Sequence, residues 1–395
     1  MITTVIIISY NSTASKHKVE LLEQRSHQIA YEAFRKKYPT GKIILYWTTY
    51  FGFYFGDWAE KKVTSDPRLG TKSFDKCPVK QCFAIRDRSL LNDSHALIFH
   101  PRDIDTEDLP NHRLVHQRYI FYNLEPPFLT TFDSKLFKKV NGLFNWTMTY
   151  RKDSDIYHPL SENPFLTIEE STPSLEHLQN KKKKVAWFVS NCNFIKSHRS
   201  EYANELRKYI QLDIFGSCGS RTCEDKKACY RMLSSDYKFY LSFENSFYRD
   251  YVTEKFFNAL LNDVVPIVYG AANYSSLITK NAFIHVDDFK SPRHLANYLN
   301  YLNDNLTAYK SYFDWRRSSN NWREVPYHKR NFCQLCEMLH NESLTSQSYP
   351  DIHNWWYDKS YVFSPNGSHG HRLNVYCYIF AVFLLAYYMT SLVHV

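Results

Sequence analysis

The stretch from Tyr237 to Gly270, YKFYLSFENSFYRDYVTEKFFNALLNDVVPIVYG, decides the fold of this chain. Its first apolar run, residues 238–243, predicts a β-strand that ends in a polar loop. Thr253 can cap a helix after this loop, and the apolar run 264–269 predicts a second strand. The pattern is that of a βαβ unit. Because anionic ligands bind where such a strand ends and the next helix begins, the loop is either a ligand site or an ordinary solvated connection.

The rest of the chain shows two series of alternating strands and helices. The first has a helix over 18–37 and strands over 42–47, 95–99 and 118–124. The second adds a strand over 185–189, a helix over 199–209 and a strand over 212–215. Residues 162–184, rich in Pro, Ser, Glu and Lys, are typical of a linker. We therefore expect an α/β protein with a first domain over 1–160, a linker over 161–184, a second domain over 185–365 and a hydrophobic tail over 366–395.

The composition excludes several classes of protein. With 44% hydrophobic and 17% aromatic residues, the 395-residue chain is globular and long enough for two domains. Only 10 glycines are present, and neither a G-x-G-x-x-G nor a Walker-type segment occurs. The net charge of +9 suits an anionic partner, but no nucleic-acid module accompanies it, so we expect no nucleic-acid partner. The basic run Lys181–Lys184 is interpreted as part of the solvated linker.

The segments FENS and DYVTEKFFNAL in the opening stretch resemble the signature of the α1,3-fucosyltransferases, glycosyltransferase family 10. The cysteine-containing segments SNC and GSCG are most similar to its invertebrate members. Further segments resemble the family and follow its order: FHPRD (Phe99–Asp103), YNLEPP (Tyr122–Pro127), NWTMTYRKDSD (Asn145–Asp155), WFVSNC (Trp187–Cys192), FIHVDDFKSP (Phe283–Pro292), YFDWR (Tyr312–Arg316) and FCQLC (Phe332–Cys336). Together they cover roughly residues 40 to 340.

The resemblance implies the GT-B fold, in which two Rossmann-like domains face a cleft that holds the reaction. It also implies the inverting transfer of L-fucose from GDP-β-L-fucose to the 3-hydroxyl of a GlcNAc residue in a glycoprotein or glycolipid glycan. Such a displacement requires a base for the incoming hydroxyl and cationic groups for the departing diphosphate. The alternative is a catalytically inactive homologue that binds a glycan or a nucleotide sugar.

Glu125 is the candidate base. It follows the apolar strand and precedes Pro126 and Pro127, which end the strand and fix the loop. From its position alone, the carboxylate could equally satisfy nearby backbone N–H groups. The resemblance implies that it acts as the general base.

Arg199 and Lys255 are the candidate cations for the leaving group. Each stands in the first turn of a predicted helix, where the helix dipole disfavours a cation, although a simple surface position would also account for both. The resemblance implies that both bind the diphosphate and that the donor site has six further members: Ser190, Asn191, Tyr240, Asn245, Tyr251 and Glu254. Of these, Glu254 would bind the ribose hydroxyls and Tyr251 the diphosphate region, whereas Tyr240 could belong to the core.

Asp153-Ser154-Asp155 matches the D-x-D metal motif of other glycosyltransferases. Its place at the end of the first domain favours a structural turn, because the cationic residues make a metal unnecessary. We expect no metal site and no required cofactor, with GDP-fucose as the donor substrate and Mn²⁺ only as a stimulator.

The segment His100-Pro101-Arg102-Asp103 bears on the choice of acceptor. In vertebrate members of the family that the chain resembles, Arg at the position of Arg102 goes with transfer to the 3-hydroxyl and Trp with transfer to the 4-hydroxyl of type 1 chains. Pro101 departs from the usual pattern. We therefore expect His100, Arg102 and Asp103 to influence selectivity, and core N-glycan GlcNAc, LacNAc and LacdiNAc all stay open as acceptors.

Nine cysteines and seven N-x-S/T sequons indicate the secretory route. The spacing of Cys333 and Cys336 would suit half a zinc site or a redox pair. The resemblance implies instead that these two form disulfides with Cys77 and Cys82 and so join the carboxyl-terminal part to the first domain. A second group is expected to form disulfides within the second domain in a pairing that spacing does not decide: Cys192, Cys218, Cys223 and Cys229.

The termini bear on attachment to a membrane. The apolar run Met1–Tyr10 is too short to span a bilayer and fits a strand or the remnant of an anchor. Residues 373–395 contain no Asp, Glu, Lys or Arg and have about the length of a spanning helix, so we expect a carboxyl-terminal anchor, with a GPI signal or translation past the true end as alternatives. The resemblance implies a Golgi membrane protein with a lumenal catalytic domain.

Overall fold

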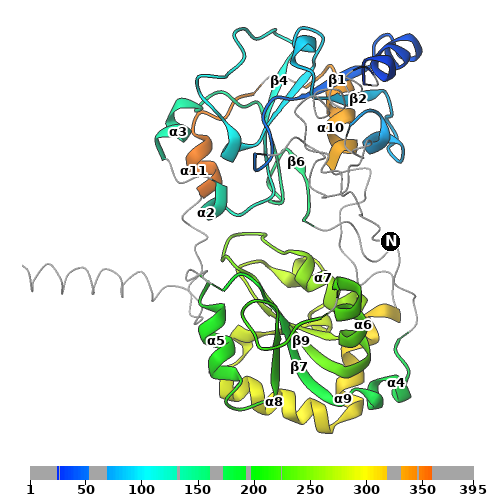
Figure 1. Cartoon of the computed structure of the whole chain (residues 1–395), viewed down its shortest axis with the longest axis vertical. Coiled ribbons are helices and arrows are strands. Elements are labelled where there is room, and N and C mark those ends of the chain that lie inside the picture. The colour runs from blue at the N-terminus through cyan, green and yellow to red at the C-terminus, as the bar shows by residue number, and fades with distance from the viewer. Residues whose placement is uncertain are drawn as a thin grey trace, which may run out of the picture. The chain divides into compact units, whose positions relative to one another are not determined.

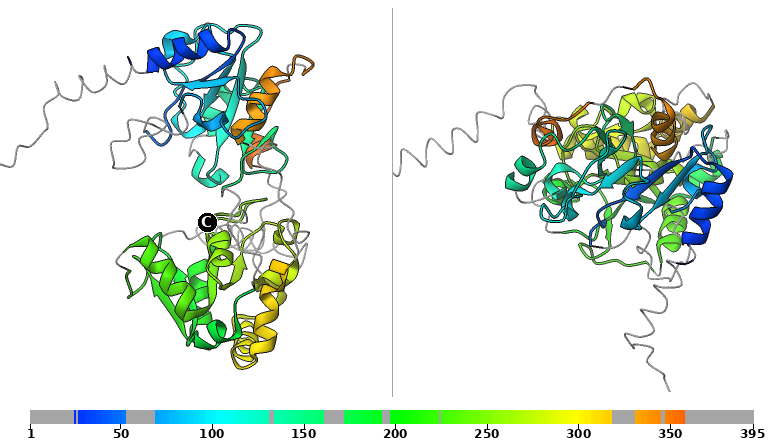
Figure 2. Two further views of the ribbon diagram at one scale, coloured as in Figure 1. Left: turned by 90° about the vertical axis from the view of Figure 1, so that its right-hand side faces the viewer. Right: turned by 90° about the horizontal axis from the view of Figure 1, so that it is seen from above.

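The computed structural model describes residues 25, 27–52, 69–130, 134–160, 172–192, 197–223, 225–317, 331–344 and 347–357. The chain divides into two compact units, and each is described by itself (Figures 1 and 2). Unit 1 comprises Met1–Thr167, Asp250–Glu254 and Trp322–Lys359. Unit 2 comprises Ile168–Arg249, Lys255–Asn321 and Ser360–Val395.

Unit 1 is built on a six-stranded sheet in the order β2-β1-β3-β4-β5-β6. Its strands are β1 (Lys42–Tyr46), β2 (Cys82–Ile85), β3 (Ala96–Phe99), β4 (Arg118–Asn123), β5 (Trp146–Thr149) and β6 (Ile156–Tyr157). Every pairing is parallel, and the central strands are buried on both faces, as parallel sheets require. Strands β2 and β3 pair on opposite sides of β1. The loops after β1 and β3 therefore run in opposite directions, which makes this position a topological switch point.

Helices cover both faces of this sheet. They are a helix over 27–37, α2 (Pro127–Thr130), α3 (Ser134–Lys139), α10 (Asn331–His340) and α11 (Ile352–Tyr357), with short 3₁₀ turns η1 (Lys72–Phe74), η2 (Arg88–Leu90) and η3 (Pro101–Asp103). On one face, Phe332 and Leu335 of α10 join the core formed by Ile44, Tyr46 and Ile98. Figure 1 shows α10 beside β1.

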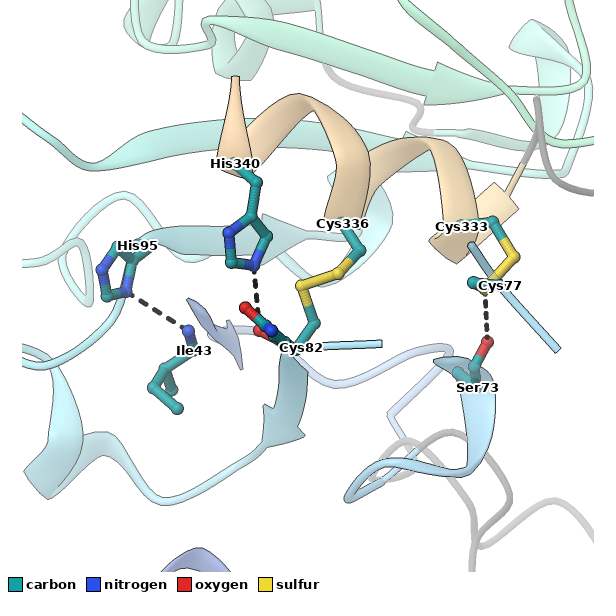
Figure 3. The surroundings of a disulfide bond; sticks show 9 residues. Ile43, Ser73, Cys77, Cys82, His95, Cys333, Cys336 and His340 are labelled. Atoms are coloured by element: carbon teal, nitrogen blue, oxygen red, sulfur yellow. Dashed lines mark hydrogen bonds between the residues drawn. A yellow bond between two sulfur atoms is a disulfide. The ribbon is translucent and has the colours of Figure 1, made fainter. Parts of the chain in front are cut away.

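The carboxyl-terminal helices therefore belong to unit 1, and the expected second-domain boundary at residue 365 is corrected. Residues 322–359 cluster with the first domain. The physical reason is that α10 buries its apolar side against the first sheet and is linked to it by two disulfides, Cys77–Cys333 and Cys82–Cys336 (Figure 3). This pairing confirms what the family resemblance implied. Since Cys82 and Cys336 share a disulfide, their sulfurs are not zinc ligands with the neighbouring His340, which instead contacts the carbonyl oxygen of Gln81 at 3.0 Å.

Unit 2 has a five-stranded parallel sheet in the order β11-β10-β9-β7-β8. Its strands are β7 (Lys183–Phe188), β8 (Leu212–Phe215), β9 (Tyr237–Phe243), β10 (Val265–Tyr269) and β11 (Ile284–His285). Its helices are α4 (Leu175–Asn180), α5 (Arg199–Leu206), α6 (Lys226–Asp236), α7 (Glu254–Leu261), α8 (Pro292–Asp304) and α9 (Leu306–Lys310), with 3₁₀ turns η6 (Tyr274–Ser276), η7 (Lys280–Ala282), η8 (Val286–Asp288) and η9 (Ser311–Arg317). The βαβ unit predicted from the opening stretch is β9-α7-β10 and is confirmed. Here the switch point lies between β7 and β9.

Alternate residues of β9 enter the cores on the two faces of this sheet. Phe239 and Leu241 join one core with Leu299 of α8, while Tyr240 joins the other with Ala259 of α7. The four cysteines of this unit pair as Cys192–Cys218 and Cys223–Cys229, which decides the pairing that the sequence left open.

The predicted linker 161–184 is corrected over its second half. Helix α4 and the start of β7 lie within it, and both belong to unit 2. Lys181, interpreted as solvated, is 1% exposed, and its ammonium donates hydrogen bonds to the carbonyl oxygens of Ser234 and Tyr237. The carbonyl groups at the end of α6 thus hold Lys181 in a buried position. The polar sequence around it does not distinguish Lys181 from its exposed neighbour Lys182.

The expected hydrophobic tail over 366–395 and the apolar run Met1–Tyr10 lie outside the described residues. Among the residues that the structure describes, no helix is both long enough and apolar enough to cross a bilayer.

The two disulfides of unit 1 predict a strongly non-additive effect on stability. Each closes a loop of more than 250 residues, 256 and 254 by separation, but either one keeps that loop closed when the other is removed. Replacing Cys77 and Cys333 by Ala should therefore cost about 2–3 kcal/mol, and removing the second pair in addition should cost about 5 kcal/mol or more. Thermal denaturation of the two double variants and the quadruple variant measures this. Equal and additive losses would contradict the shared-loop argument.

From the burial of Lys181 we predict that the free energy of unfolding rises between pH 7 and 9.5. Burial lowers its pKa from 10.5 to about 8, so the unfolded chain binds more protons than the folded chain across this interval. Unfolding free energy should therefore increase by about 2 kcal/mol as the folded lysine loses its proton. Denaturant unfolding at several pH values should show that rise in the wild type and in Lys182→Met. It should be absent from Lys181→Met, and a persistent rise in that variant would refute the assignment.

Candidate active site

The carboxyl edge of the unit 2 sheet gathers most of the predicted donor-site residues. Ser190 and Asn191 follow β7, Glu244 and Asn245 follow β9, and Arg199 begins α5. The two loops leave neighbouring strands on either side of the switch point, where parallel α/β sheets form their ligand crevice.

Arg199 connects these two loops. Its guanidinium is 3% exposed and donates to the carbonyl oxygens of Phe243 at 3.2 Å and Asn191 at 3.0 Å. It also lies over the ring of Trp187, with 5.9 Å between the guanidinium carbon and the ring centroid. Each of these three contacts is with a neutral group, and the charge of Arg199 at the start of α5 adds to the positive end of the helix dipole. A buried positive potential of this kind favours an anionic ligand.

Lys255 supplies a second cation in the first turn of α7. Its ammonium lies 3.3 Å from a carboxylate oxygen of Glu244, which is fully buried. Gly270 follows β10, and a Cβ there would lie 2.6 Å from the hydroxyl of Tyr274 and 3.4 Å from Cγ of Glu244. The close approach of the buried Tyr274 hydroxyl therefore favours a glycine at this position. Sequence reasoning did not assign Glu244 a role.

Several buried polar atoms at this edge make no hydrogen bond within the described part of the chain. They are Oγ of Ser197, Oη of Tyr202, Oδ1 of Asn245 and Oγ of Ser246. Burial, together with the nearby Asp287, raises the pKa of Tyr202, so its hydroxyl stays protonated and able to donate. Because buried polar groups are normally paired, these atoms suit a polar ligand at the switch point. Only Asn245 was predicted from the sequence.

The remaining predicted donor-site residues occupy different surroundings. Ser190 and Asn191 are exposed on a loop that the Cys192–Cys218 disulfide ties to the loop after β8. Glu254 is exposed at the start of α7. Tyr251 is buried in the short segment assigned to unit 1, where its ring contacts that of Tyr150 with 5.1 Å between centroids.

Tyr240 does not share the loop environment of the other predicted residues. It is buried within β9, and its ring packs edge-on against Phe188 at a centroid distance of 5.2 Å. Its place in the core formed with Ala259 and Val264 supports the structural alternative raised for it from the sequence.

In unit 1, Glu125 lies on the turn that follows β4. It is half-buried, and its backbone N–H donates to Oδ1 of the buried Asn123 at 3.0 Å. Pro126 and Pro127 follow, and Pro127 is the first residue of α2, a position that suits proline because its missing N–H would have no helical partner. The local structure therefore presents Glu125 from a rigid turn at the carboxyl edge of the sheet.

His100 and Asp103 form a buried pair at the unit 1 switch point. The ring Nδ1 of His100 contacts Oδ2 of Asp103. This oxygen also accepts from the backbone N–H of Phe51 at 2.7 Å, and Oδ1 accepts from the N–H of Gly52 at 2.6 Å. Burial lowers the pKa of His100, so the ring is neutral and Nδ1–H is the donor. Although burial opposes it, these hydrogen bonds lower the pKa of Asp103.

This pair fixes the loop after β1 in an unusual conformation. Phe51 has φ of +56° and Gly52 of +75°, and the Asp103 carboxylate satisfies both of their N–H groups. The guanidinium of Arg102 lies over the ring of Phe51, with 5.0 Å between the guanidinium carbon and the ring centroid. His100 and Asp103 are therefore structural supports, and Arg102 is the exposed member of the three.

The aspartates of the D-x-D segment engage the protein itself. Asp153 forms a two-pronged pair with Arg151, at 2.9 and 2.6 Å. Asp155 accepts from the N–H of Thr147, the amide of Gln347 and the hydroxyl of Tyr349 at 2.6–2.8 Å. These contacts support the interpretation of the segment as a structural turn.

Comparisons with known proteins agree with this architecture. A family model described as the amino-terminal domain of fucosyltransferases matches residues 39–161, and one described as the carboxyl-terminal part of glycosyltransferase family 10 (fucosyltransferase) matches residues 178–355. Two solved α1,3-fucosyltransferase structures, one with GDP-fucose, superpose with TM-scores of 0.51 and 0.52. They cover 78% and 77% of this chain and 92% and 91% of theirs, at 17% and 18% identity. The expected GT-B type of fold is thereby confirmed.

Curated relatives are more similar in sequence. Alpha-(1,3)-fucosyltransferase C of Drosophila melanogaster is 33% identical over 80% of this chain and 78% of its own length. Glycoprotein 3-alpha-L-fucosyltransferase A of the same organism is 38% identical over 71% of this chain, and 4-galactosyl-N-acetylglucosaminide 3-alpha-L-fucosyltransferase 9 of Rattus norvegicus is 43% identical over 60%. The chain spans 55% and 65% of the lengths of these last two. The matches along both halves show that this chain belongs to glycosyltransferase family 10, the fucosyltransferase family.

Proposed function

We propose that the protein transfers L-fucose from GDP-β-L-fucose to the 3-hydroxyl of a GlcNAc residue in a glycoprotein or glycolipid glycan, with inversion at the anomeric carbon. The observation that carries this proposal is the buried Arg199 at the switch point, together with Lys255 and the nearby buried polar atoms that make no hydrogen bond among the described residues. This set of groups suits a nucleoside diphosphate. Family membership and a relative solved with GDP-fucose supply the choice of sugar.

Each assigned residue has its own part in the proposed reaction. Glu125 accepts the proton of the acceptor hydroxyl as that oxygen forms its bond to the anomeric carbon of fucose. The bond from this carbon to the diphosphate oxygen breaks, and Arg199 and Lys255 stabilise the charge on the departing GDP. Asn245 and the Ser190–Asn191 loop contact the donor, and Glu254 and Tyr251 bind the ribose and the diphosphate region.

We propose that this cation pair makes a metal unnecessary for leaving-group departure. Transfer should therefore persist in EDTA, and added Mn²⁺ should change the rate only modestly. Complete loss of activity in EDTA, restored by Mn²⁺, would refute this part of the mechanism.

Arg102 is exposed beside the switch-point loop of unit 1. The 3-hydroxyl as the site of transfer is supported by the match of Arg102 to the arginine of vertebrate family members, and not by its place in the structure. Transfer from labelled GDP-fucose to LacNAc, LacdiNAc, a type 1 chain and a core N-glycopeptide tests the activity and names the acceptor. Tight GDP binding without transfer to any of them would favour the inactive, nucleotide-sugar-binding alternative.

The base assignment predicts the behaviour of Glu125→Gln. This substitution keeps the shape of the side chain but removes its ability to accept a proton, so kcat should fall by about 10²- to 10⁴-fold. The GDP dissociation constant should change little, because the cations that we assign to GDP lie in unit 2. Steady-state kinetics and calorimetric GDP titration measure both quantities, and wild-type turnover would eliminate Glu125 as the base.

The leaving-group assignment predicts weaker GDP binding. Loss of a charge-assisted contact in Arg199→Ala should raise the GDP dissociation constant roughly tenfold or more. For Lys255, the double variant Glu244→Gln/Lys255→Ala avoids leaving a buried carboxylate unpaired. Arg231→Ala, an exposed arginine on α6, is the matched control. Unchanged affinity in folded Arg199 and Lys255 variants would contradict their role.

We further propose a membrane-attached protein of the Golgi with its catalytic part in the lumen. The four disulfides support an oxidising compartment. The structure also distinguishes the sequons by burial. Asn92, Asn273 and Asn341 are exposed, whereas Asn145 is buried, with its amide donating to the carbonyl of Gln347 at 2.7 Å.

This localisation predicts a specific pattern of N-glycans. In the full chain expressed in insect cells, glycosidase treatment and mass spectrometry should find glycans at the three exposed sequons and none at Asn145. A full chain without glycans at any of these positions would contradict the lumenal assignment.

A further inference from the structure

The last described segment of unit 1, residues 347–357, is held by side chains from distant parts of the chain. We call it the C-terminal strap. Tyr349 donates its hydroxyl to Asp155 at 2.7 Å and its N–H to the carbonyl of Phe144 at 3.0 Å. Arg151 donates to the main-chain carbonyl of Trp355 and lies over its ring at 4.3 Å. These contacts fix the strap and its helix α11 on unit 1.

Near its end the strap places the buried indole of Trp356 beside the turn that contains Glu125. Trp356 is 1% exposed, and its Nε1–H donates to Oγ1 of Thr130 at 2.7 Å, which places α11 next to α2 (Figure 1). The amide of Asn123 donates to the same oxygen at 2.6 Å. Indole N–H and amide N–H₂ can only donate, so the Thr130 hydroxyl accepts both bonds and must direct its own proton elsewhere. Its hydrogen bond runs to the carbonyl of Pro126, at 3.3 Å.

This arrangement fixes the turn from both sides of Glu125. Asn123 accepts the N–H of Glu125 on its Oδ1 while its amide is held by Thr130. The carbonyl of Pro126, the next residue, is held by the same hydroxyl. Asn123 and Thr130 are buried, so water does not compete for these bonds, and each donor and acceptor has one orientation.

We propose that Trp356, Thr130 and Asn123 are positioning residues for Glu125, and that the C-terminal strap thereby completes the catalytic turn. This proposal rests on the proposed role of Glu125 as base. It assigns a catalytic purpose to a tryptophan more than 200 residues away in sequence, at the end of the described chain. None of the three residues needs to touch the substrate.

The test compares Thr130→Val, which removes the hydroxyl at nearly constant volume, with Thr130→Ser, which keeps it, in the full chain. We expect Thr130→Val to lower kcat at least tenfold and to shift the acid limb of the pH–rate profile, with an unchanged GDP dissociation constant. Thr130→Ser should stay within about twofold of wild type. Trp356→Phe, which keeps an aromatic ring but loses the N–H donor, should lower kcat in the same direction. Wild-type kcat and pH profile in folded Thr130→Val would overturn the proposal, as would equal losses in Thr130→Val and Thr130→Ser.

A second comparison separates this proposal from the base assignment. In the Glu125→Gln background, Thr130→Val should cause no further loss of kcat, because the group that it positions no longer acts as a base. A further loss of the same size as in the wild-type background would show that Thr130 acts otherwise and would overturn the proposal. Normal turnover in Glu125→Gln alone would refute the base and the proposal together. A slow Glu125→Gln with an unaffected Thr130→Val would refute the proposal only.

Discussion

The parallel pairing of strands is the constraint on which the rest of this structure depends. In both sheets the carboxyl ends of all strands lie at one edge. In both, the second strand of the chain pairs on one side of the first strand and the third strand pairs on its other side, which creates a switch point. The polar loops that follow the strands in sequence therefore come together at this edge as a consequence of the strand pairing alone. For this reason Arg199 reaches the carbonyl of Phe243 at the end of β9 in unit 2, and the N–H of His100 reaches Thr48 in the loop after β1 in unit 1.

The structure also buries several charged side chains, and the groups that compensate the charge differ from one side chain to the next. Arg199 and Lys181 are held by neutral carbonyl oxygens, whereas Lys255 pairs with the buried Glu244. Burying a charge without such partners is costly, so these groups are either structural, as at Lys181, or suited to a ligand of opposite sign. Arg199 lies at the carboxyl edge of the unit 2 sheet, where we propose that it binds an anionic ligand, whereas Lys181 lies at the end of α4.

Much of the fold and part of the candidate site followed from the sequence. Strands β1, β3, β4, β7, β8, β9 and β10 were predicted within about one or two residues, because each is an apolar run bounded by polar residues. Strands β2, β5 and β6 were missed: β6 has only two residues, and the four residues of β5 include two polar threonines that interrupt its apolar run. The assignment of residues 322–359 to unit 1 was also missed, because the apolar periodicity of α10 says that it is buried but not against which sheet.

The sequence by itself determined most of the element types, the family and most of the residues to which we assign a chemical role, because these depend on local composition and on ordered short segments. Only the tertiary structure decided the partners: the pairing Cys192–Cys218 and Cys223–Cys229, the burial of Lys181, the support of Lys255 by Glu244 and the return of Trp356 to the turn of Glu125. Each of these joins groups from different elements. Their meeting is set by how sheets and helices pack in three dimensions, which no local pattern of residues records.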